Sequence, residues 1–276
     1  PPTGYRRTVE SAISSSAPRR VVHCVFLFGY VYPMAFFVSL RRHLRNRAIA
    51  ASPLLASVPP ELHSGVGKRV CVSREKRFCY FRVPKAANST VTNSMAAAIY
   101  GQRGLDDSAN VAKASFRDIT EIATLTEEQL LAGYYCFTIV RHPLSRVLSA
   151  YLDKVQRHDA TQVVNGDIPG GVTFDYFLDY LADGGIFKNI HWAPQDSIVP
   201  IHPDKLHFVG RVENLDEDFA GLSTAIFGEA KPLMNRQSGR TGAAAKVAAV
   251  YTARQRALVE RLYAEDIRRF YAPASG

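Results

Sequence analysis

The sequence of 276 residues contains few cysteines, and they form no metal-binding pattern. The four cysteines, Cys24, Cys71, Cys79 and Cys136, include no C-x-x-C pair, and no Cys/His cluster has the spacing of a zinc site. These absences exclude a zinc module and a disulfide-dense domain, and we expect no metal. Cys136 lies in an apolar run and is predicted to be a buried thiol, whereas a disulfide between Cys71 and Cys79 stays open.

The sequence also lacks the distributed basic charge of a nucleic-acid-binding protein, although its net charge is +9. Residues 1–60 contain eight arginines, no lysine and one acidic residue, so they carry +7 of that charge and leave +2 for residues 61–276. We therefore expect no nucleic-acid partner for the larger part of the chain. Only binding that survives removal of residues 1–60 would favour a basic module for nucleic acid or membrane surfaces.

One apolar segment is long enough to cross a membrane as a helix. Residues 21–40 (VVHCVFLFGYVYPMAFFVSL) contain no Asp, Glu, Lys or Arg and have arginines on both sides. The segment is longer than the apolar part of a signal peptide. It is either a membrane anchor or a helix or hairpin docked on the domain. The protein is accordingly expected to be membrane-associated or cytoplasmic, with a Golgi-like lumen as the option in a eukaryote.

Residues 48–67 are rich in Ala, Ser and Pro and nearly uncharged, which is typical of a linker. We therefore divide the chain into a basic N-terminal segment, residues 1–67, and one domain, residues 68–276. The length of the second part suits a single α/β domain.

A strand, a loop and a helix follow one another at residues 78–100. Residues 78–83 (FCYFRV) predict a buried strand, residues 85–90 (KAANST) a tight loop, and residues 91–100 a helix. The first turn of a helix has unpaired N–H groups and a positive dipole end, which bind phosphate or sulfate. Lys85 would add a cation there, and Ser89 and Thr90 would add hydroxyl groups, which could cap the helix instead of or as well as contacting the anion.

This loop is not a Walker A sequence. It lacks both glycines of G-x-x-x-x-G-K-[ST], and Lys85 precedes the loop instead of closing it. A nucleotide kinase or NTPase is therefore the disfavoured alternative, although a related fold is not excluded.

A second strand and helix repeat this arrangement. Residues 134–140 (YYCFTIV) read as a buried parallel strand, and residues 144–155 have apolar side chains at helical spacing after Arg141-His142-Pro143. Since ligands of open α/β sheets bind at the carboxyl ends of the strands, Arg141 and Lys85 are expected at the same edge.

Together these segments resemble the sulfotransferase family that uses 3′-phosphoadenosine 5′-phosphosulfate (PAPS), in its carbohydrate branch, sulfotransferase family 2. The resemblance extends over residues 72–271. Its motifs, in order, are the 5′-phosphosulfate loop FCYFRVPKAANSTV, the 3′-phosphate motif FTIVRHPLSRVLSAY, NIHWAPQ, FVGRVENLDED and LVERLYAEDIRRFY.

The resemblance implies an α/β fold, a three-layer sandwich with a central, mostly parallel sheet of the P-loop NTPase-like sulfotransferase type. It implies an enzyme that transfers a sulfuryl group from PAPS to a hydroxyl group, on a carbohydrate or glycan, by direct in-line displacement without a metal. An inactive sulfotransferase-like binding protein is the alternative.

The resemblance also implies roles for individual residues. Lys85 would be catalytic, and the donor would be held by Lys85, Ala87, Asn88, Ser89 and Thr90 on its 5′ side and by Arg141 and Ser149 at its 3′-phosphate. His191 is the candidate general base, with His158 and Asp153 as substitutes. Arg146 is expected to face solvent or form a salt bridge, and Glu213 to be structural or functional.

Three residues depart from the family pattern, one of them Asn88, which precedes the two hydroxyl residues. Ala87 stands where the family has glycine, which is tolerated if its φ is negative. His142 stands where Asp or Glu is common, and it could make the donor site sensitive to pH. Two loops could close over the donor or the acceptor: residues 157–172, and the segment with Asn235, Arg236 and Ser238. The alternative for each is an ordinary surface loop.

Overall fold

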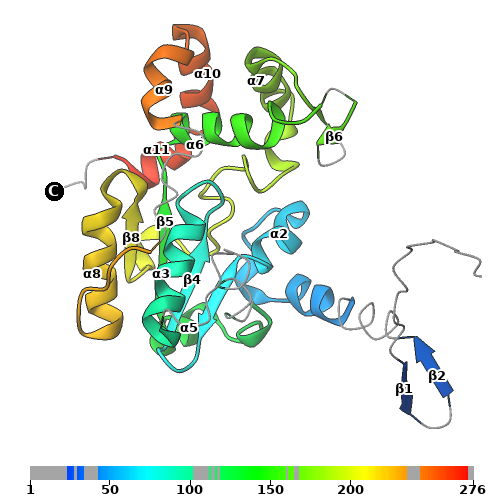
Figure 1. Ribbon diagram of the computed structural model, residues 1–276, viewed down its shortest axis with the longest axis vertical. Coiled ribbons are helices and arrows are strands. Elements are labelled where there is room, and N and C mark those ends of the chain that lie inside the picture. Colours follow the sequence, from blue (N-terminus) through cyan, green and yellow to red (C-terminus); the bar gives the residue numbers. More distant parts are fainter. Residues whose placement is uncertain are drawn as a thin grey trace, which may run out of the picture. The chain divides into compact units, whose positions relative to one another are not determined.

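The structure is a computed structural model that describes residues 24–27, 30–33, 43–101, 112, 116, 119–159, 161–164, 168–234 and 243–272. The chain divides into two compact units, residues 1–44 and 45–276. In the first unit, β1 (Cys24–Leu27) and β2 (Tyr30–Pro33) pair antiparallel, with Cys24 opposite Pro33 (Figure 1).

These two strands lie within the candidate membrane anchor, residues 21–40. The other residues of that segment lie outside the described part of the chain. Among the described residues, no helix is both long and apolar enough to cross a membrane. The anchor therefore stays a prediction.

The described residues of the second unit form a four-stranded sheet. Its strands are β3 (Val70–Ser73), β4 (Phe78–Arg82), β5 (Tyr135–Val140) and β8 (Phe208–Arg211), in the order β3-β4-β5-β8. The β3–β4 pair is antiparallel, and the β4–β5 and β5–β8 pairs are parallel. The prediction of a mostly parallel sheet is confirmed. β4 is buried along its whole length, because a parallel strand is covered on both faces.

Helices cover this sheet and form an additional helical layer (Figure 1). They are α2 (His63–Gly67), α3 (Asn88–Tyr100), α5 (Glu127–Gly133), α6 (Pro143–Ala150), α7 (Phe174–Ala182), α8 (Leu215–Phe227), α9 (Ala243–Val250), α10 (Ala253–Leu262) and α11 (Ala264–Phe270). A π-helical turn, Tyr151–Val155, continues α6, and β6 (Val163–Val164) pairs with β7 (Ile168–Pro169).

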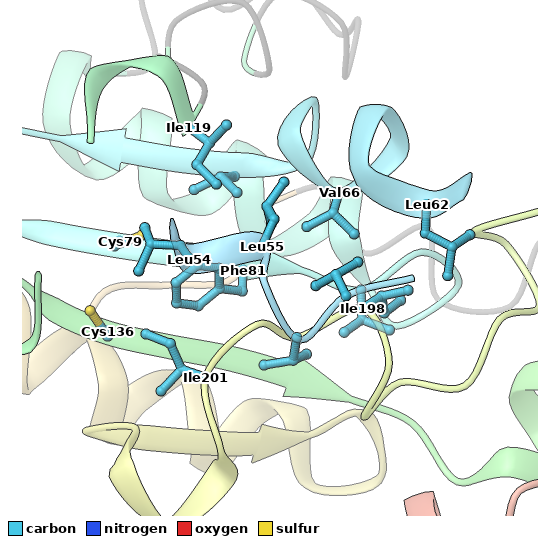
Figure 2. Close-up of a cluster of buried hydrophobic side chains, with 14 of the residues drawn as sticks. Leu54, Leu55, Leu62, Val66, Cys79, Phe81, Ile119, Cys136, Ile198 and Ile201 are labelled. Atoms are coloured by element: carbon cyan, nitrogen blue, oxygen red, sulfur yellow. The ribbon is translucent and has the colours of Figure 1, made fainter. Parts of the chain in front are cut away.

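The alternation of side chains along β4 separates two hydrophobic cores. Phe78 and Tyr80 face a cluster that includes Val91 and Met95 of α3 and Phe219 of α8. The intervening side chains face the opposite cluster, which Figure 2 shows: it contains Leu54, Leu55, Leu62, Val66, Cys79, Phe81, Ile119, Cys136, Ile198 and Ile201. A third cluster joins α6, α7 and α10 around Trp192. The layered α/β sandwich follows from this two-residue period.

The structure differs from the expected linker at residues 48–67. Leu54, Leu55 and Val66 are buried in the core beneath the sheet, and the compact unit begins at Arg45. Two short 3₁₀ turns, Pro53–Leu55 and Pro60–Leu62, lie in this segment and contain the buried side chains of Leu54, Leu55 and Leu62. Composition alone concealed this pattern because the apolar residues are widely spaced.

Cys71 and Cys79 do not form the disulfide that the sequence left open. Cys71 pairs with Tyr80 and Val72 with Cys79 in the antiparallel register, so the two thiols face opposite sides of the sheet. Cys71, Cys79 and Cys136 are buried and are not in a disulfide, as predicted for the buried thiol of Cys136.

Candidate functional site

The loop between β4 and α3 leads into a helix terminus that is open to an anion. Ala87 is the N-cap residue of α3, and it offers no side-chain hydrogen bond; the first turn contains no acidic residue. Ser89 and Thr90 do not cap the helix, so that interpretation is wrong. The first N–H groups and the positive end of the helix dipole are therefore available to a phosphate or sulfate group.

Two non-glycine residues of this loop adopt left-handed backbone conformations. Lys85 has a φ of 69° and Ala87 a φ of 50°. The sequence required a negative φ for Ala87 to fit in place of the family glycine, and that expectation is wrong. A methyl group in this region costs about 1–2 kcal/mol relative to glycine. The loop is thus held in a strained shape by its surroundings.

Lys85 extends from this loop to the π-helical turn after α6. Its Nζ lies 3.0 Å from Oδ2 of Asp153, which Lys154 also contacts at 3.2 Å. Burial lowers the pKa of the Lys85 ammonium, and Asp153 acts in the opposite direction. Burial alone would raise the pKa of Asp153, but Lys85 and Lys154 outweigh it and hold that pKa well below its usual range. Asp153 is therefore charged at neutral pH, and it favours the charged form of Lys85.

Arg141 connects the end of β5 to the loop that carries Lys85. Its Nη1 donates to the carbonyl oxygen of Lys85 at 3.2 Å, and its Nε donates to Oγ of Ser145 at 3.0 Å. Ser149 is buried one turn further along α6. The structure thus brings Lys85 and Arg141 to one edge of the sheet, as the strand–loop–helix pattern predicts.

Arg146 is buried, which makes the expected solvent-facing or salt-bridged position wrong. Its side chain is 1% exposed and donates to three backbone carbonyl oxygens: Pro84 at 3.0 Å, Ala193 at 2.7 Å and Ile190 at 3.3 Å. The guanidinium joins the loop before α3 to the NIHWAPQ segment. A charged residue within an otherwise apolar helix was the signal in the sequence that could have indicated this role.

Gln195 and Asp266 fix the same segment against Arg141. The side chain of Gln195 accepts the backbone N–H of Arg141 at 2.9 Å and donates to its carbonyl oxygen at 2.9 Å. Asp266, which is fully buried, accepts the backbone N–H groups of Gln195 and Asp196, both at 2.9 Å. Burial raises the pKa of Asp266, whereas Arg146 and these donors act to lower it. The sequence motifs contained both residues but gave no indication of this contact.

His191 is oriented by its neighbour Asn189. Oδ1 of Asn189 accepts the backbone N–H of His191 at 2.9 Å and lies 2.8 Å from its Nδ1. An amide oxygen only accepts, so Nδ1 carries the hydrogen and Nε2 carries the lone pair. Burial, together with Arg69, Lys154 and Lys85, lowers the pKa of His191 to about 3. The ring is therefore neutral and lies within the electric field of the lysines.

Two arginines that the sequence reasoning missed complete this side of the site. Nη2 of Arg69 lies 3.5 Å from Nε2 of His191. Arg82, at the end of β4, donates to the carbonyl oxygens of Lys68 at 2.6 Å and Arg69 at 3.0 Å and lies 3.5 Å from Oδ1 of Asn88. An arginine that ends a buried strand was the available signal for Arg82.

Glu213 forms hydrogen bonds that connect two elements next to Arg141. Its carboxylate accepts the backbone N–H of His142 at 2.9 Å and the hydroxyl of Tyr271 at 3.1 Å. Burial lowers the pKa of His142, and Glu213 acts to raise it. His142 lies edge-on to Tyr271, with 5.1 Å between the ring centroids. These contacts join the end of β5 to the C-terminal helix.

Of the remaining candidate residues, the structure describes only His158. His158 is exposed, and its Nδ1 lies 2.9 Å from Oε1 of Gln162 within the loop at residues 157–172, which is described in part. Asn235, Arg236 and Ser238 lie outside the described residues. In the part of the chain that the structure describes, no cluster of three His, Cys, Asp or Glu residues has a geometry that could hold a metal ion.

Comparison with known proteins gives a family and several relatives. The sequence profile of the sulfotransferase family matches residues 68–272. Carbohydrate sulfotransferase 14 of Homo sapiens is 33% identical over 210 residues, which are 66% of this chain and 54% of the relative. The Mus musculus and Danio rerio proteins of the same name are 31% identical over 208 residues and 27% identical over 182 residues, covering 66% and 59% of this chain and 54% and 49% of their own.

The chain thus spans about half the length of the curated relatives that it matches. No solved structure matches it. The mostly parallel sheet flanked by helices fits the α/β sulfotransferase fold, and the finer likeness to P-loop NTPases stays a prediction.

Proposed function

Since the chain belongs to the sulfotransferase family, as its match over residues 68–272 establishes, we propose that it transfers a sulfuryl group from PAPS to a carbohydrate hydroxyl. One observation carries the proposal: Lys85 and Arg141 converge at the carboxyl ends of two parallel strands, beside an uncapped helix terminus. Such an edge collects positive charge where a sulfated nucleotide has its anionic groups.

The donor would be held from two sides. On the 5′ side, the N–H groups of the first turn of α3 and the side chains of Asn88, Ser89 and Thr90 suit the phosphosulfate. Ala87 contributes backbone, since its left-handed conformation turns the chain into the helix. On the 3′ side, the guanidinium of Arg141 suits bidentate contact with a phosphate, and Ser149 lies two turns into α6.

Lys85 is the proposed catalytic residue. In sulfuryl transfer, the acceptor oxygen forms a bond to sulfur while the bond from sulfur to the bridging oxygen breaks, and its electron pair stays on the nucleotide phosphate. The ammonium of Lys85 would stabilise the charge that develops on this oxygen. The supporting observation is that Lys85 contacts a carboxylate, is half-buried and lies next to the helix terminus.

His191 is the proposed general base, because the hydrogen bond to Asn189 leaves the lone pair on Nε2, where it can take the acceptor proton once the long contact with Arg69, 3.5 Å, gives way. Its pKa of about 3 makes it a weak base while the site holds only cations. A bound polyanion would offset the field of Lys85 and Lys154 and so raise that pKa. Asp153 suits this role less well, because three cations already contact its carboxylate.

The same proposal includes a membrane anchor at residues 21–40 and no nucleic-acid partner. The charge-free run of that segment supports the first, and the low net charge of residues 61–276 supports the second.

The first experiment is a calorimetric titration of the full chain with 3′-phosphoadenosine 5′-phosphate, the product of the donor, beside Lys85→Ala and Arg141→Ala. We expect binding that Arg141→Ala removes, because the 3′-phosphate then loses its guanidinium. Lys188→Ala, at an exposed lysine after α7, is the control and should bind like the wild type.

A panel of carbohydrate acceptors with labelled PAPS then tests transfer. A folded wild-type protein that binds no nucleotide would contradict the proposed function. It would favour one of two alternatives. The first is an inactive relative, which the departures from the family pattern at Ala87 and His142 support, and the second is an ATP-using enzyme, which magnesium-dependent ATP turnover would reveal.

A further inference from the structure

Lys85 and Asp153 form an ion pair between two segments that are far apart in the sequence. The Nζ–Oδ2 distance is 3.0 Å, and the two side chains are 15% and 25% exposed. Asp153 lies in the π-helical turn Tyr151–Val155, where the wider turn interrupts the α-helical repeat that begins with α6. Such turns frequently occur at functional sites, because they re-aim a side chain that an α-helix would direct elsewhere.

Asp153 contacts two further cations on the solvent side. Nζ of Lys154 lies 3.2 Å from its Oδ2, and Nη1 of Arg157 lies 3.1 Å from its Oδ1. These side chains are 33% and 57% exposed, more than that of Lys85. If Lys85 moved away, the carboxylate would keep two partners in contact with water. The departure of Lys85 therefore leaves no unpaired buried charge, which would be the costly outcome.

Lys85, in contrast, depends on Asp153 for its charge. Burial lowers the pKa of the ammonium, and Lys154 from the π-helical turn and Arg141 from the end of β5 lower it further. His191, on the adjacent segment, is neutral in the field of Lys85. Asp153 is the group that acts in the opposite direction among those that face Lys85. Without it, the lysine would lose its proton at a lower pH.

We propose that Asp153 is a positioning residue that holds the ammonium of Lys85 in the donor-free enzyme. When PAPS binds, the ammonium leaves the carboxylate of Asp153 and contacts the bridging oxygen of the donor. The inference rests on the proposed function, because it takes Lys85 as the donor lysine. It assigns Asp153 to the preparation of the lysine instead of to proton removal. After the nucleotide product leaves, the ammonium returns to the carboxylate, and Lys154 and Arg157 stay with Asp153 throughout.

The test is the uptake of protons when the full chain binds PAPS. Calorimetry in two buffers of different ionisation enthalpy measures this uptake, between about pH 7 and pH 10, below the ordinary pKa of lysine. In Asp153→Asn, we expect proton uptake to begin at a lower pH than in the wild type, because the unpaired ammonium deprotonates earlier and the anionic donor restores its proton. At neutral pH, PAPS should bind up to about five-fold tighter, because a competing carboxylate of this exposure is gone.

A control variant and a lysine-free background make the result specific. Asp183→Asn, at the exposed C-cap of α7, should leave both quantities unchanged. In the Lys85→Ala background, Asp153→Asn should no longer move the onset of proton uptake, because the group that titrates is absent. Asp153→Glu should restore the wild-type onset of proton uptake. If Asp153→Asn does not fold, Asp153→Ser takes its place and should show the same shift.

The outcomes separate the inference from the proposed function. Two results would overturn the proposed role of Asp153 while leaving the donor site intact. One is a wild-type onset of proton uptake in Asp153→Asn, and the other is an equal shift of the onset by Asp153→Asn in the Lys85→Ala background. If Lys85→Ala itself leaves the affinity for PAPS and the proton uptake unchanged, Lys85 is not the donor lysine, and the proposed function fails.

Discussion

Arg146 donates from Nε to the carbonyl oxygen of Pro84 at 3.0 Å, so a buried guanidinium of α6 supports the loop that precedes α3. The same side chain reaches Ala193 and Ile190 on the segment that carries His191. The two halves of the candidate site, the donor loop and the candidate base, therefore share one cation as their support.

Replacement of Arg146 should lower the free energy of unfolding more than replacement of an exposed arginine. Arg146→Met removes the hydrogen bonds to three buried carbonyl oxygens, and we expect a loss of about 3–5 kcal/mol in the free energy of unfolding. Denaturant titration measures it. Arg254→Met, at a side chain that is 75% exposed, should change the stability by less than about 0.5 kcal/mol. Equal effects of the two substitutions would contradict the role of Arg146.

Ala87→Gly should stabilise the protein. Its φ of 50° is costly for an alanine and free for a glycine, and we expect a gain of about 1 kcal/mol after the entropy that glycine adds to the unfolded chain. Ala98→Gly, in the interior of α3, has the opposite expectation, a loss of about 1 kcal/mol. Urea titration of both variants measures the pair. A loss of stability in Ala87→Gly would mean that the loop is not left-handed there.

The free energy of unfolding should decrease as the pH is lowered, because His191 is buried in its neutral form. Its pKa of about 3 lies below that of an unfolded chain, so the unfolded state binds the extra proton first. The contribution of His191 is complete above about pH 6.5 and is lost as the pH falls toward 3. Between pH 7 and pH 5, the wild type should lose about 1–2 kcal/mol more than His191→Gln. His158→Gln, at an exposed histidine, should follow the wild type, and identical curves for all three would refute the expectation.

Asn189 should matter for catalysis and little for donor binding. Asn189→Ala removes the acceptor that fixes the hydrogen on Nδ1 of His191, and we expect kcat to fall by about 10- to 100-fold. The affinity for 3′-phosphoadenosine 5′-phosphate should change little. Asn189→Asp, which keeps an acceptor at this position, should recover most of the rate. A parallel loss of nucleotide affinity in Asn189→Ala would indicate a structural role instead.

Local patterns in the sequence were sufficient for the elements that carry the site. The aromatic and β-branched residues 78–83 predict a buried strand, the continuous apolar run of residues 134–140 predicts a buried parallel strand, and the structure has β4 and β5 there. Parallel neighbours end at one edge, so the convergence of Lys85 and Arg141 follows from the order strand, loop, helix. These signals are local in the chain, since periodicity and turn residues act over a few positions.

Long-range contacts were not accessible in this way. The buried position of Leu54, Leu55 and Val66 depends on a sheet face formed by residues downstream, so their segment looked like a linker. The positive φ of Ala87 depends on the contacts around the loop and not on the preference of alanine. The opposite orientation of Cys71 and Cys79 depends on the register of β3 and β4.

The sequence by itself determined the family, the succession of strand, loop and helix that makes an anion site, and the choice of Lys85 and Arg141 as its candidate residues, because motifs and periodicity are properties of neighbouring residues. Only the tertiary structure decided what holds these groups: Arg146 on three carbonyl oxygens, Asn189 on His191, and Asp153 on Lys85. The physical reason is that burial and ion pairing arise when distant segments meet. The charge of Lys85 and the support that Arg146 gives to the donor loop therefore come from partners that lie tens of residues away in the chain, whereas the orientation of His191 comes from Asn189, two residues away.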